Sequence, residues 1–228
     1  MVDSSRRIFL QKAGVGLATI GASGLVLRSD AVPTQEVNRD RVVIELAQVK
    51  SEAPPKAELK KVVSFPYGPF YKEGAPFRGK LSLPGEPGTQ FVLSGRVWGF
   101  DTKQPLPGVV LDVWHVDMNE KYSNGITDFR NRGRLVSSET GHYELESIRP
   151  IPYRPNPQGA PDFWRCAHFH LVAVAPGYRQ LITEIHFHGD PKRSDPMYRI
   201  ENAIAVEERT MNGATFQTGV FDIVLERA

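Results

Sequence analysis

Short apolar segments that alternate with turns constrain the fold of this chain more than any other feature. In 109–114 and 221–225, apolar and β-branched residues recur with a period near two, which places one face of an extended strand against a core. Turn signals with proline or glycine, at 105–108, 139–141 and 175–177, separate such segments. We therefore expect an all-β fold, an antiparallel β-sandwich with long inserted loops.

The expected strands are spread over the second two-thirds of the chain. Segments with strand character are Gln90–Trp98, Val109–Val116, His142–Ile148, His168–Ala175, Leu181–Phe187 and Phe216–Leu225. Met197–Glu208 is the best candidate for a helix, and no long amphipathic helix is evident. The 18 prolines and 20 glycines follow no period, so they indicate turns between strands and not a collagen-like polymer.

The N-terminus has the features of a targeting segment. Arg6 and Arg7 precede an apolar run of 15 residues, 13–27, and this arrangement resembles a twin-arginine signal peptide. The run is shorter than the roughly 20 residues that span a bilayer, so we expect no stable membrane span. The resemblance predicts cleavage after Ala31 and an exported protein, periplasmic or secreted. The alternative is an amphipathic helix with an accidental arginine pair.

Three segments are expected: a signal peptide at 1–31, a linker and N-terminal arm at 32–61, and one β-sandwich domain at 62–228. The linker is polar and punctuated by prolines. The net charge is +2, and four basic and two acidic residues among the first 31 account for it. The remainder of the chain is therefore neutral, which argues against nucleic acid as a partner. Cys166 is the single cysteine, which excludes an intrachain disulfide.

Two His-x-His pairs are the first candidates for chemistry. Alternate side chains share a face of a strand, so His168 and His170 can bind one metal ion through two imidazoles. Such a pair alone is weak evidence, because it more often decorates a solvated face. A second pair, His186 and His188, could complete a four-histidine site, but we interpret these as ordinary strand residues. Cys166 with His168 and His170 leaves a copper or zinc site open, although a small buried thiol is the commoner use of one cysteine.

Several motifs occur in an order that matches a known family. They are Trp114-His115 followed by Tyr122-Ser123, Gly141-His142-Tyr143, Tyr153 among prolines, and Arg165-Cys166-Ala167-His168-Phe169-His170. Together with 67–71, 74–76 and 177–183, they resemble the intradiol ring-cleavage dioxygenases that act on catechol and protocatechuate. The resemblance covers roughly 65–198, which makes 62–228 the catalytic domain.

The resemblance implies that Tyr122, Tyr153, His168 and His170 bind a non-haem Fe(III) ion in the loops of the sandwich. Two phenolates and two imidazoles are hard, electron-rich donors that favour Fe(III) over Fe(II). The implied partners are a catechol-type substrate and O2, and the implied product is a muconate-type diacid. The resemblance leaves the substituent on the substrate ring open, and the oligomeric state as well, with a homo-oligomer as one alternative.

Three further residues receive roles from the resemblance. Tyr153 would also accept a proton from the substrate, and Arg165 would stabilise negative charge that develops on the ring. Glu184 stands where the family usually has glutamine. Three interpretations of Glu184 stay open: it acts as a base, changes substrate preference, or pairs with Arg165.

Each of these residues has a commoner structural use. A buried tyrosine whose hydroxyl is hydrogen-bonded is more frequent than a tyrosinate ligand, and a lone Arg165 is more often a salt-bridged loop residue. Two departures from the family pattern also stand out. Cys166 replaces a proline, and Glu120-Lys121 precede Tyr122 where a glycine is common, which we expect to alter only a turn.

Two rival functions remain at this point. The segment 139–143 and the strand after it also resemble transthyretin-like domains, so the chain could be an exported binding module without catalysis. The second rival is a different metallo-oxidase that uses Cys166. The combined set of two tyrosines, two histidines and Arg165 favours the dioxygenase, because a binding module has no need for it. Loop correspondence also suggests Pro69, Phe70, Trp98 and Pro105 as pocket residues.

Overall fold

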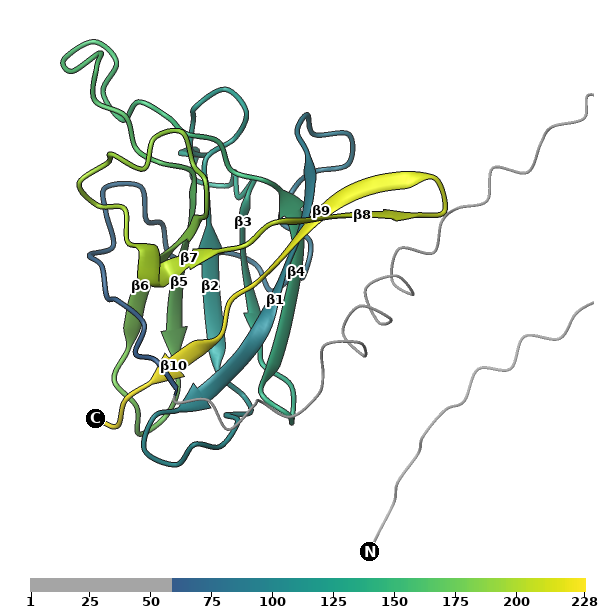
Figure 1. Cartoon of the computed structure of the whole chain (residues 1–228), viewed down its shortest axis with the longest axis vertical. Helices are drawn as coiled ribbons and strands as arrows, with labels where there is room; N and C mark the ends of the chain where they lie inside the picture. Colours follow the sequence, from purple (N-terminus) through teal and green to yellow (C-terminus); the bar gives the residue numbers. More distant parts are fainter. Residues whose placement is uncertain (1–58) are drawn as a thin grey trace, which may run out of the picture. The chain divides into compact units, whose positions relative to one another are not determined.

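Residues 59–228 are described by a computed structural model, and two five-stranded sheets lie against each other in this part of the chain (Figure 1). In the first sheet, β1 is the central strand because it pairs along both of its edges. On one edge it pairs antiparallel with β4. On the other edge it pairs parallel first with β9 and then with β10, and β8 pairs antiparallel with β9. The bounds are β1 Gln90–Gly99, β4 His142–Ile148, β8 Glu207–Met211, β9 Ala214–Val220 and β10 Ile223–Leu225.

The second sheet has the order β3-β2-β5-β6-β7. Its bounds are β2 Val110–Trp114, β3 Arg132–Val136, β5 His168–Val174, β6 Leu181–Phe187 and β7 Ala203–Ile204. All neighbours are antiparallel except β6 and β7, which run parallel. The sandwich prediction is confirmed, with the qualification that both sheets are mixed.

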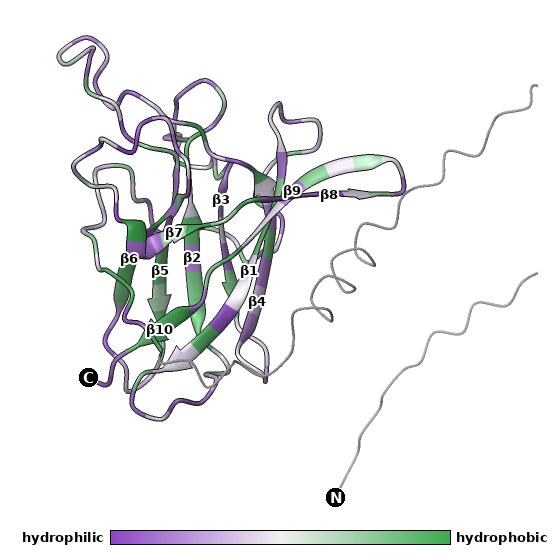
Figure 2. Ribbon diagram, in the orientation of Figure 1, coloured by the Kyte–Doolittle hydropathy of each residue, from purple (hydrophilic) through white to green (hydrophobic). Residues whose placement is uncertain are grey.

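The core lies between the two sheets and follows the period of two. On β5, Phe169, Leu171 and Ala173 are fully buried among the side chains of the first sheet. Phe91 of β1 contacts Phe169 with ring centroids 5.8 Å apart, so the sheets meet through aromatic rings. Burying each large apolar side chain contributes about 1.5–3 kcal/mol. Figure 2 shows the hydrophobic colour on strands such as β2, β6 and β10 and the hydrophilic colour on many loops.

The other face of the second sheet, which we call the outer face, is also covered. A second cluster of buried side chains lies there, formed by Trp114, Val116, Tyr122, Tyr153 and Val172, with Tyr67, Phe70 and Tyr71 packed against it. Loops between strands supply most of these residues. The alternating positions of β5 therefore enter two different environments, the core and this loop-covered outer face.

Several predicted elements differ from the structure. Met197–Glu208 is not a helix: it contains one short 3-10 helix, Ile200–Asn202, then β7 and the first residues of β8. Asn202 explains this, because its buried side chain donates to Val63, Thr183 and Glu184 and so holds the segment against β6. Strands β3, β7 and β8 were not predicted.

The last predicted strand, Phe216–Leu225, is divided into β9 and β10. At the break, the Asp222 carboxylate accepts a hydrogen bond from the Arg96 backbone amide at 2.9 Å. The predicted signal peptide and most of the predicted linker lie outside the described residues. Within residues 59–228, we find no helix with the length and apolar composition that crossing a bilayer requires.

Candidate metal centre

The two histidines of the first His-x-His pair lie side by side on the outer face. His168 and His170 are 1% and 3% exposed, and each faces a polar residue of β6 in the strand register. His168 pairs with His186, and His170 pairs with Glu184. Because β5 and β6 are joined by a continuous ladder, the backbone fixes these four positions.

The two predicted tyrosines come from loops and meet the histidines. Tyr122 follows β2 and Tyr153 follows β4. The Tyr122 hydroxyl donates to Tyr153 Oη at 3.3 Å and lies 3.2 Å from His170 Nε2, and the Nε2 atoms of His168 and His170 are 3.1 Å apart. Metal–ligand bonds of about 2.1 Å place neighbouring donors about 3.0–3.5 Å apart. These four atoms, which we call the donor cluster, therefore fit around one ion.

The ring nitrogens of the histidines are oriented for such a role. His168 Nδ1 donates to the Cys166 carbonyl at 2.7 Å, which leaves the lone pair of Nε2 directed at the donor cluster. Trp114 stacks on the His170 ring, with centroids 4.7 Å apart and planes 7° apart, and fixes its orientation. Burial lowers the pKa of His168 to about 4 and that of His170 well below its usual value. Both rings are therefore neutral near pH 7, the form that binds metals.

The tyrosines fit the same interpretation. Burial, followed by the neighbouring Tyr153, raises the pKa of Tyr122 well above its ordinary value, and burial also raises the pKa of Tyr153. Without a cation, both side chains are neutral phenols. A bound metal ion reverses this preference, because its charge stabilises the phenolate form of a coordinating tyrosine. The donor set therefore fits a metal ion of high charge, both in the chemistry of its phenol and imidazole donors and in the distances between them.

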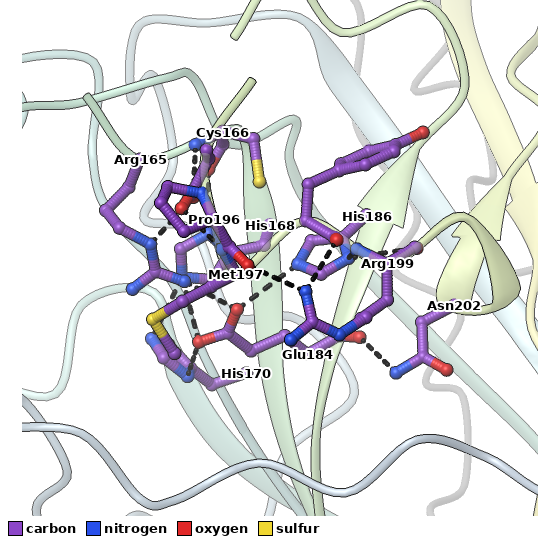
Figure 3. A network of polar contacts seen from close by, with 12 residues as sticks. Arg165, Cys166, His168, His170, Glu184, His186, Pro196, Met197, Arg199 and Asn202 are labelled. Atoms are coloured by element: carbon purple, nitrogen blue, oxygen red, sulfur yellow. Dashed lines mark hydrogen bonds and ion pairs between the residues drawn. The ribbon is translucent and has the colours of Figure 1, made fainter. Parts of the chain in front are cut away.

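Arg165 pairs with two carboxylates next to this cluster, and Figure 3 labels the residue of one of them, Glu184. Arg165 Nη2 donates to Glu184 at 2.6 Å and its Nε donates to Asp195 at 2.8 Å. Burial alone would lower the pKa of Arg165, but the two carboxylates raise it above its usual range. Burial likewise favours the neutral form of Glu184, but the adjacent histidines and Arg165 hold the pKa of its carboxyl below the usual range. Of the three interpretations of Glu184, pairing with Arg165 is the one that the structure contains.

Glu184 also forms a second group of candidate ligands with the histidines. Its Oε1 lies 3.8 Å from His168 Nε2 and 3.7 Å from His170 Nδ1, and all three residues are buried. The Glu184 carboxylate is on the Nδ1 side of the His170 ring, whereas the donor cluster contains Nε2. Glu184 Oε2 is already engaged by Arg165 and, at 3.2 Å, by His186. We therefore interpret Glu184 as a support of the histidines.

Cys166 and the second His-x-His pair do not join the donor cluster. Cys166 lies before β5, its backbone amide donates to Asp195, and burial raises the pKa of its thiol. Within residues 59–228, the cluster of candidate metal-binding His, Cys, Asp and Glu side chains does not include Cys166. The His186 ring bonds Glu184 and accepts from the Arg199 backbone amide at 3.1 Å, and His188 is exposed. The four-histidine arrangement is not formed.

The departure at Glu120 has a structural explanation. Glu120 has a φ of +61°, a left-handed conformation that glycine adopts without strain. The Asp117 carboxylate stabilises this turn by accepting from the amides of Asn119 and Lys121. The Glu120 carboxylate accepts from the Nε and the backbone amide of Arg154, both at 3.2 Å. The residue therefore links the loop of Tyr122 to the loop of Tyr153.

The two tyrosines also line a cleft of about 790 Å³. Its other lining residues are Phe70, Asp117, Met118, Asn119, Glu120, Lys121, Asn124, Arg130, Arg154, Pro155, Pro157 and Gln158. Of the suggested pocket residues, Phe70 lines the cleft and stacks on Tyr122, with planes 10° apart. Trp98 and Pro105 form a bridge with each other at β1, and neither they nor Pro69 line this cleft.

Comparisons with known proteins identify the family of this chain. The Dioxygenase_C family model, described as Dioxygenase, matches residues 67–227. Chlorocatechol 1,2-dioxygenase from Rhodococcus opacus is 37% identical over 182 residues, which is 70% of this chain and 70% of that protein.

Two solved structures extend the comparison to the fold. The dioxygenase domain of a dioxygenase and carbohydrate-binding protein fusion from Streptomyces sp. SirexAA-E is 29% identical, with a TM-score of 0.62 over 74% of this chain and 100% of that one. Catechol 1,2-dioxygenase from Pseudomonas arvilla C-1 is 28% identical, with a TM-score of 0.65 over 74% of this chain and 62% of that one. The chain therefore belongs to the intradiol ring-cleavage dioxygenases, a family of enzymes.

Proposed function

We propose that this enzyme cleaves a catechol-type diol between its two hydroxyl-bearing carbons, with O2, at a non-haem Fe(III) ion. Tyr122, Tyr153, His168 and His170 would hold the ion, and the product would be a muconate-type diacid. The observation that carries the proposal is the convergence of two phenol oxygens and two imidazole nitrogens, 3.1–3.3 Å apart, beside a cleft. Membership of an enzyme family argues against a non-catalytic binding module.

The chain's own residues have distinct tasks in this scheme. Bound Fe(III) would supply Lewis acidity, which makes the hydroxyl groups of the substrate more acidic. Tyr153 lines the cleft and belongs to the donor cluster, so its Oη is placed to accept a proton from a substrate hydroxyl. The ring of Tyr122 is held in place by Phe70, which stacks on it with centroids 4.5 Å apart.

Arg165 would act as a fixed positive charge behind Tyr153. The backbones of the two residues form a bridge, with Arg165 N donating to Tyr153 O at 2.8 Å. Arg165 is 8% exposed and does not line the cleft. Its two carboxylate partners keep it in place, so the charge needs no reorganisation when negative charge develops on the substrate.

The alternative with Cys166 as a ligand has weak support. The thiol is held in its neutral form by burial and by the nearby Asp195. A metal would have to displace that proton and recruit donors from outside the cluster that the described residues form. We therefore retain the tyrosine and histidine set as the proposed site.

The decisive experiment is a reconstitution of the purified protein with iron. Tyrosinate bound to Fe(III) gives a wine-red colour, and oxygen uptake with catechol, protocatechuate, hydroxyquinol and chlorinated catechols then identifies the substrate. We expect colour, and oxygen uptake with formation of a diacid, for at least one of these diols. A colourless protein that takes up no oxygen with any of them contradicts the proposal. Relatives that act on chlorocatechol and catechol guide the choice of substrates.

We also propose that the protein is exported through the twin-arginine pathway. Arg6 and Arg7 precede the apolar run, as such leaders require. Transport of a folded protein suits an enzyme that acquires its metal inside the cell. Replacing both arginines with lysine keeps the net charge and is expected to retain the protein in the cytoplasm. Normal export of that variant, measured by cell fractionation, contradicts the proposal.

A further inference from the structure

Arg132 is a buried arginine that the proposed chemistry does not yet use. It is the first residue of β3 and lies opposite Trp114 in the register with β2. Only 2% of the residue is exposed, and it does not line the cleft. A buried cation normally has a carboxylate partner, because moving an unpaired charge out of water is costly.

The partners of Arg132 satisfy only part of its guanidinium. Nε donates to the Ser123 carbonyl at 3.2 Å and to the Ser123 hydroxyl at 3.0 Å. Nη1 and Nη2 are buried and have no hydrogen-bond partner. Among residues 59–228, no carboxylate forms an ion pair with Arg132; Asp112, on the neighbouring strand, instead accepts from Tyr71 at 3.3 Å. A buried polar group of this kind calls for an explanation.

Tyr122 can supply compensating charge to Arg132. The Arg132 guanidinium carbon lies 5.9 Å from the centre of the Tyr122 ring. Ser123, which Arg132 holds, is the next residue in the chain. A tyrosine becomes anionic when it coordinates a metal, so the missing counter-charge would appear on metal binding.

We propose that Arg132 is a positioning residue for Tyr122. Its Nε anchors the backbone after Tyr122 to β3, and its guanidinium is the buried counter-charge of the Tyr122 oxygen in the metal-bound state. The inference rests on the proposed function, because it needs Tyr122 as a metal ligand. It also accounts for the two unpaired nitrogens, which keep the cation available to the phenolate. Arg165 differs, since two carboxylates already compensate its charge.

The test uses three variants that separate charge from anchoring. Arg132→Gln removes the charge and keeps a donor, Arg132→Lys keeps the charge and removes the planar fork, and Ser123→Ala removes one acceptor only. Iron content, the tyrosinate-to-iron absorption band and the iron reduction potential are measured after reconstitution. A cation beside a phenolate lowers the energy of its electrons, so its removal moves the band to longer wavelength and lowers the potential.

We expect Arg132→Gln to bind iron about tenfold more weakly or worse, with the shifted band and lower potential, whereas Ser123→Ala keeps the wild-type band. The metal-free Arg132→Gln protein is expected to melt at a higher temperature than metal-free wild type, because an uncompensated charge is gone. A purely structural role predicts the opposite shift in melting. If Arg132→Gln does not fold, Arg132→Lys decides, since its band must stay near that of the wild type.

The outcomes distinguish this inference from the proposed function. A wild-type protein that binds no iron and shows no colour contradicts the proposed function, and the inference falls with it. A red, active wild type whose band and potential are unchanged in Arg132→Gln overturns the inference alone. A band that moves as far in Arg132→Lys as in Arg132→Gln also overturns it, because the charge is then irrelevant.

Discussion

His168 and His170 stand on strand β5, whereas Tyr122 and Tyr153 stand on loops over the outer face of the same sheet. The backbone ladder between β5 and β6 fixes the histidine half. Side-chain contacts hold the tyrosine half, among them the link from Glu120 that joins the two loops. The histidine half should therefore tolerate changes in the loops, and the tyrosine half should not.

Removing one donor should have the largest effect, because each of the four atoms of the donor cluster supplies one of the proposed bonds to the metal. We expect His168→Ala to bind iron more than about 100-fold more weakly, since losing even an outer-shell partner costs 10–100-fold. Tyr122→Phe keeps the ring that stacks on Phe70 and removes only the oxygen, so colour should be lost. Iron per chain after dialysis and visible absorption measure both effects.

The matched control is His188→Ala, on an exposed residue just after β6. It should keep the iron and the colour of the wild type. If His168→Ala and Tyr122→Phe both retain full iron and unchanged colour, the metal site lies elsewhere. The two halves would then not form one metal site.

Arg165 supports both halves, so its removal should lower turnover and not iron binding. An arginine cannot be a ligand while it stays protonated. Losing one preorganised charge typically costs roughly 3–4 kcal/mol, or about a hundred- to a thousandfold in rate, and we expect this for Arg165→Leu. Single-turnover cleavage with catechol already bound separates chemistry from affinity.

The structure shows that Arg165→Leu also leaves Glu184 and Asp195 without their cation. The double variant Arg165→Leu with Glu184→Gln removes one of these buried charges and is the appropriate control. If the rate loss reflects the missing cation, the double variant should stay slow. Recovery of wild-type turnover in the double variant would assign the defect to the unpaired Glu184 instead.

Substitutions of Glu120 test the tyrosine half, and their effects should be smaller. Glu120→Ala and Glu120→Gly both break the link to Arg154, a partly exposed ion pair that contributes about 0–1 kcal/mol. Glycine also relieves the left-handed backbone, which costs about 1–2 kcal/mol for a residue with a Cβ. We expect the glycine variant to unfold at higher denaturant concentration than the alanine variant.

In these two Glu120 variants, iron affinity should respond differently from the free energy of unfolding. It should fall several-fold in both variants by the same factor, because both lose the link between the tyrosine loops. Equal stability of the two variants would show that the left-handed turn is unstrained. Unchanged iron affinity in both variants would mean that other contacts hold the tyrosines. The tyrosine half would then be less sensitive to changes in the loops than expected.

The sequence predicted the histidine half better than the tyrosine half for a physical reason. A period of two fixes which residues of one strand share a face, so the spacing of His168 and His170 suffices. No local rule places Tyr122 beside Tyr153, and only the resemblance to a family joined them. The pairing of Asp195 with Arg165 was not predicted, because the two residues are 30 positions apart and no motif connects them.

The same reasoning explains the errors in the fold. Strand β3 contains Arg132 and Arg134. Their charges do not suggest a strand unless the outer face and its loops are already known. The segment after Met197 has apolar residues at helical spacing, but the hydrogen bonds of Asn202 to distant residues determine its path. Long-range contacts of this kind are outside the reach of periodicity.

The smallest effect concerns Asp112 on β2, and it should alter stability without altering iron. Burial raises the pKa of Asp112 to about 6, although Tyr71 donates to the carboxylate. A carboxyl whose pKa is higher in the folded state than in the unfolded state stabilises the fold while protonated, and this contribution is lost as pH rises from about 4 to about 6. Asp112→Asn should therefore match the wild type near pH 4 and exceed its stability at pH 7 by on the order of 1 kcal/mol. Urea unfolding of both proteins across this range measures the difference, and iron content at pH 7 should be the same in both. A variant that is less stable at pH 7 would show that the ionised carboxylate has a cationic partner, for which Arg134, opposite Asp112 in the strand register, is the first candidate.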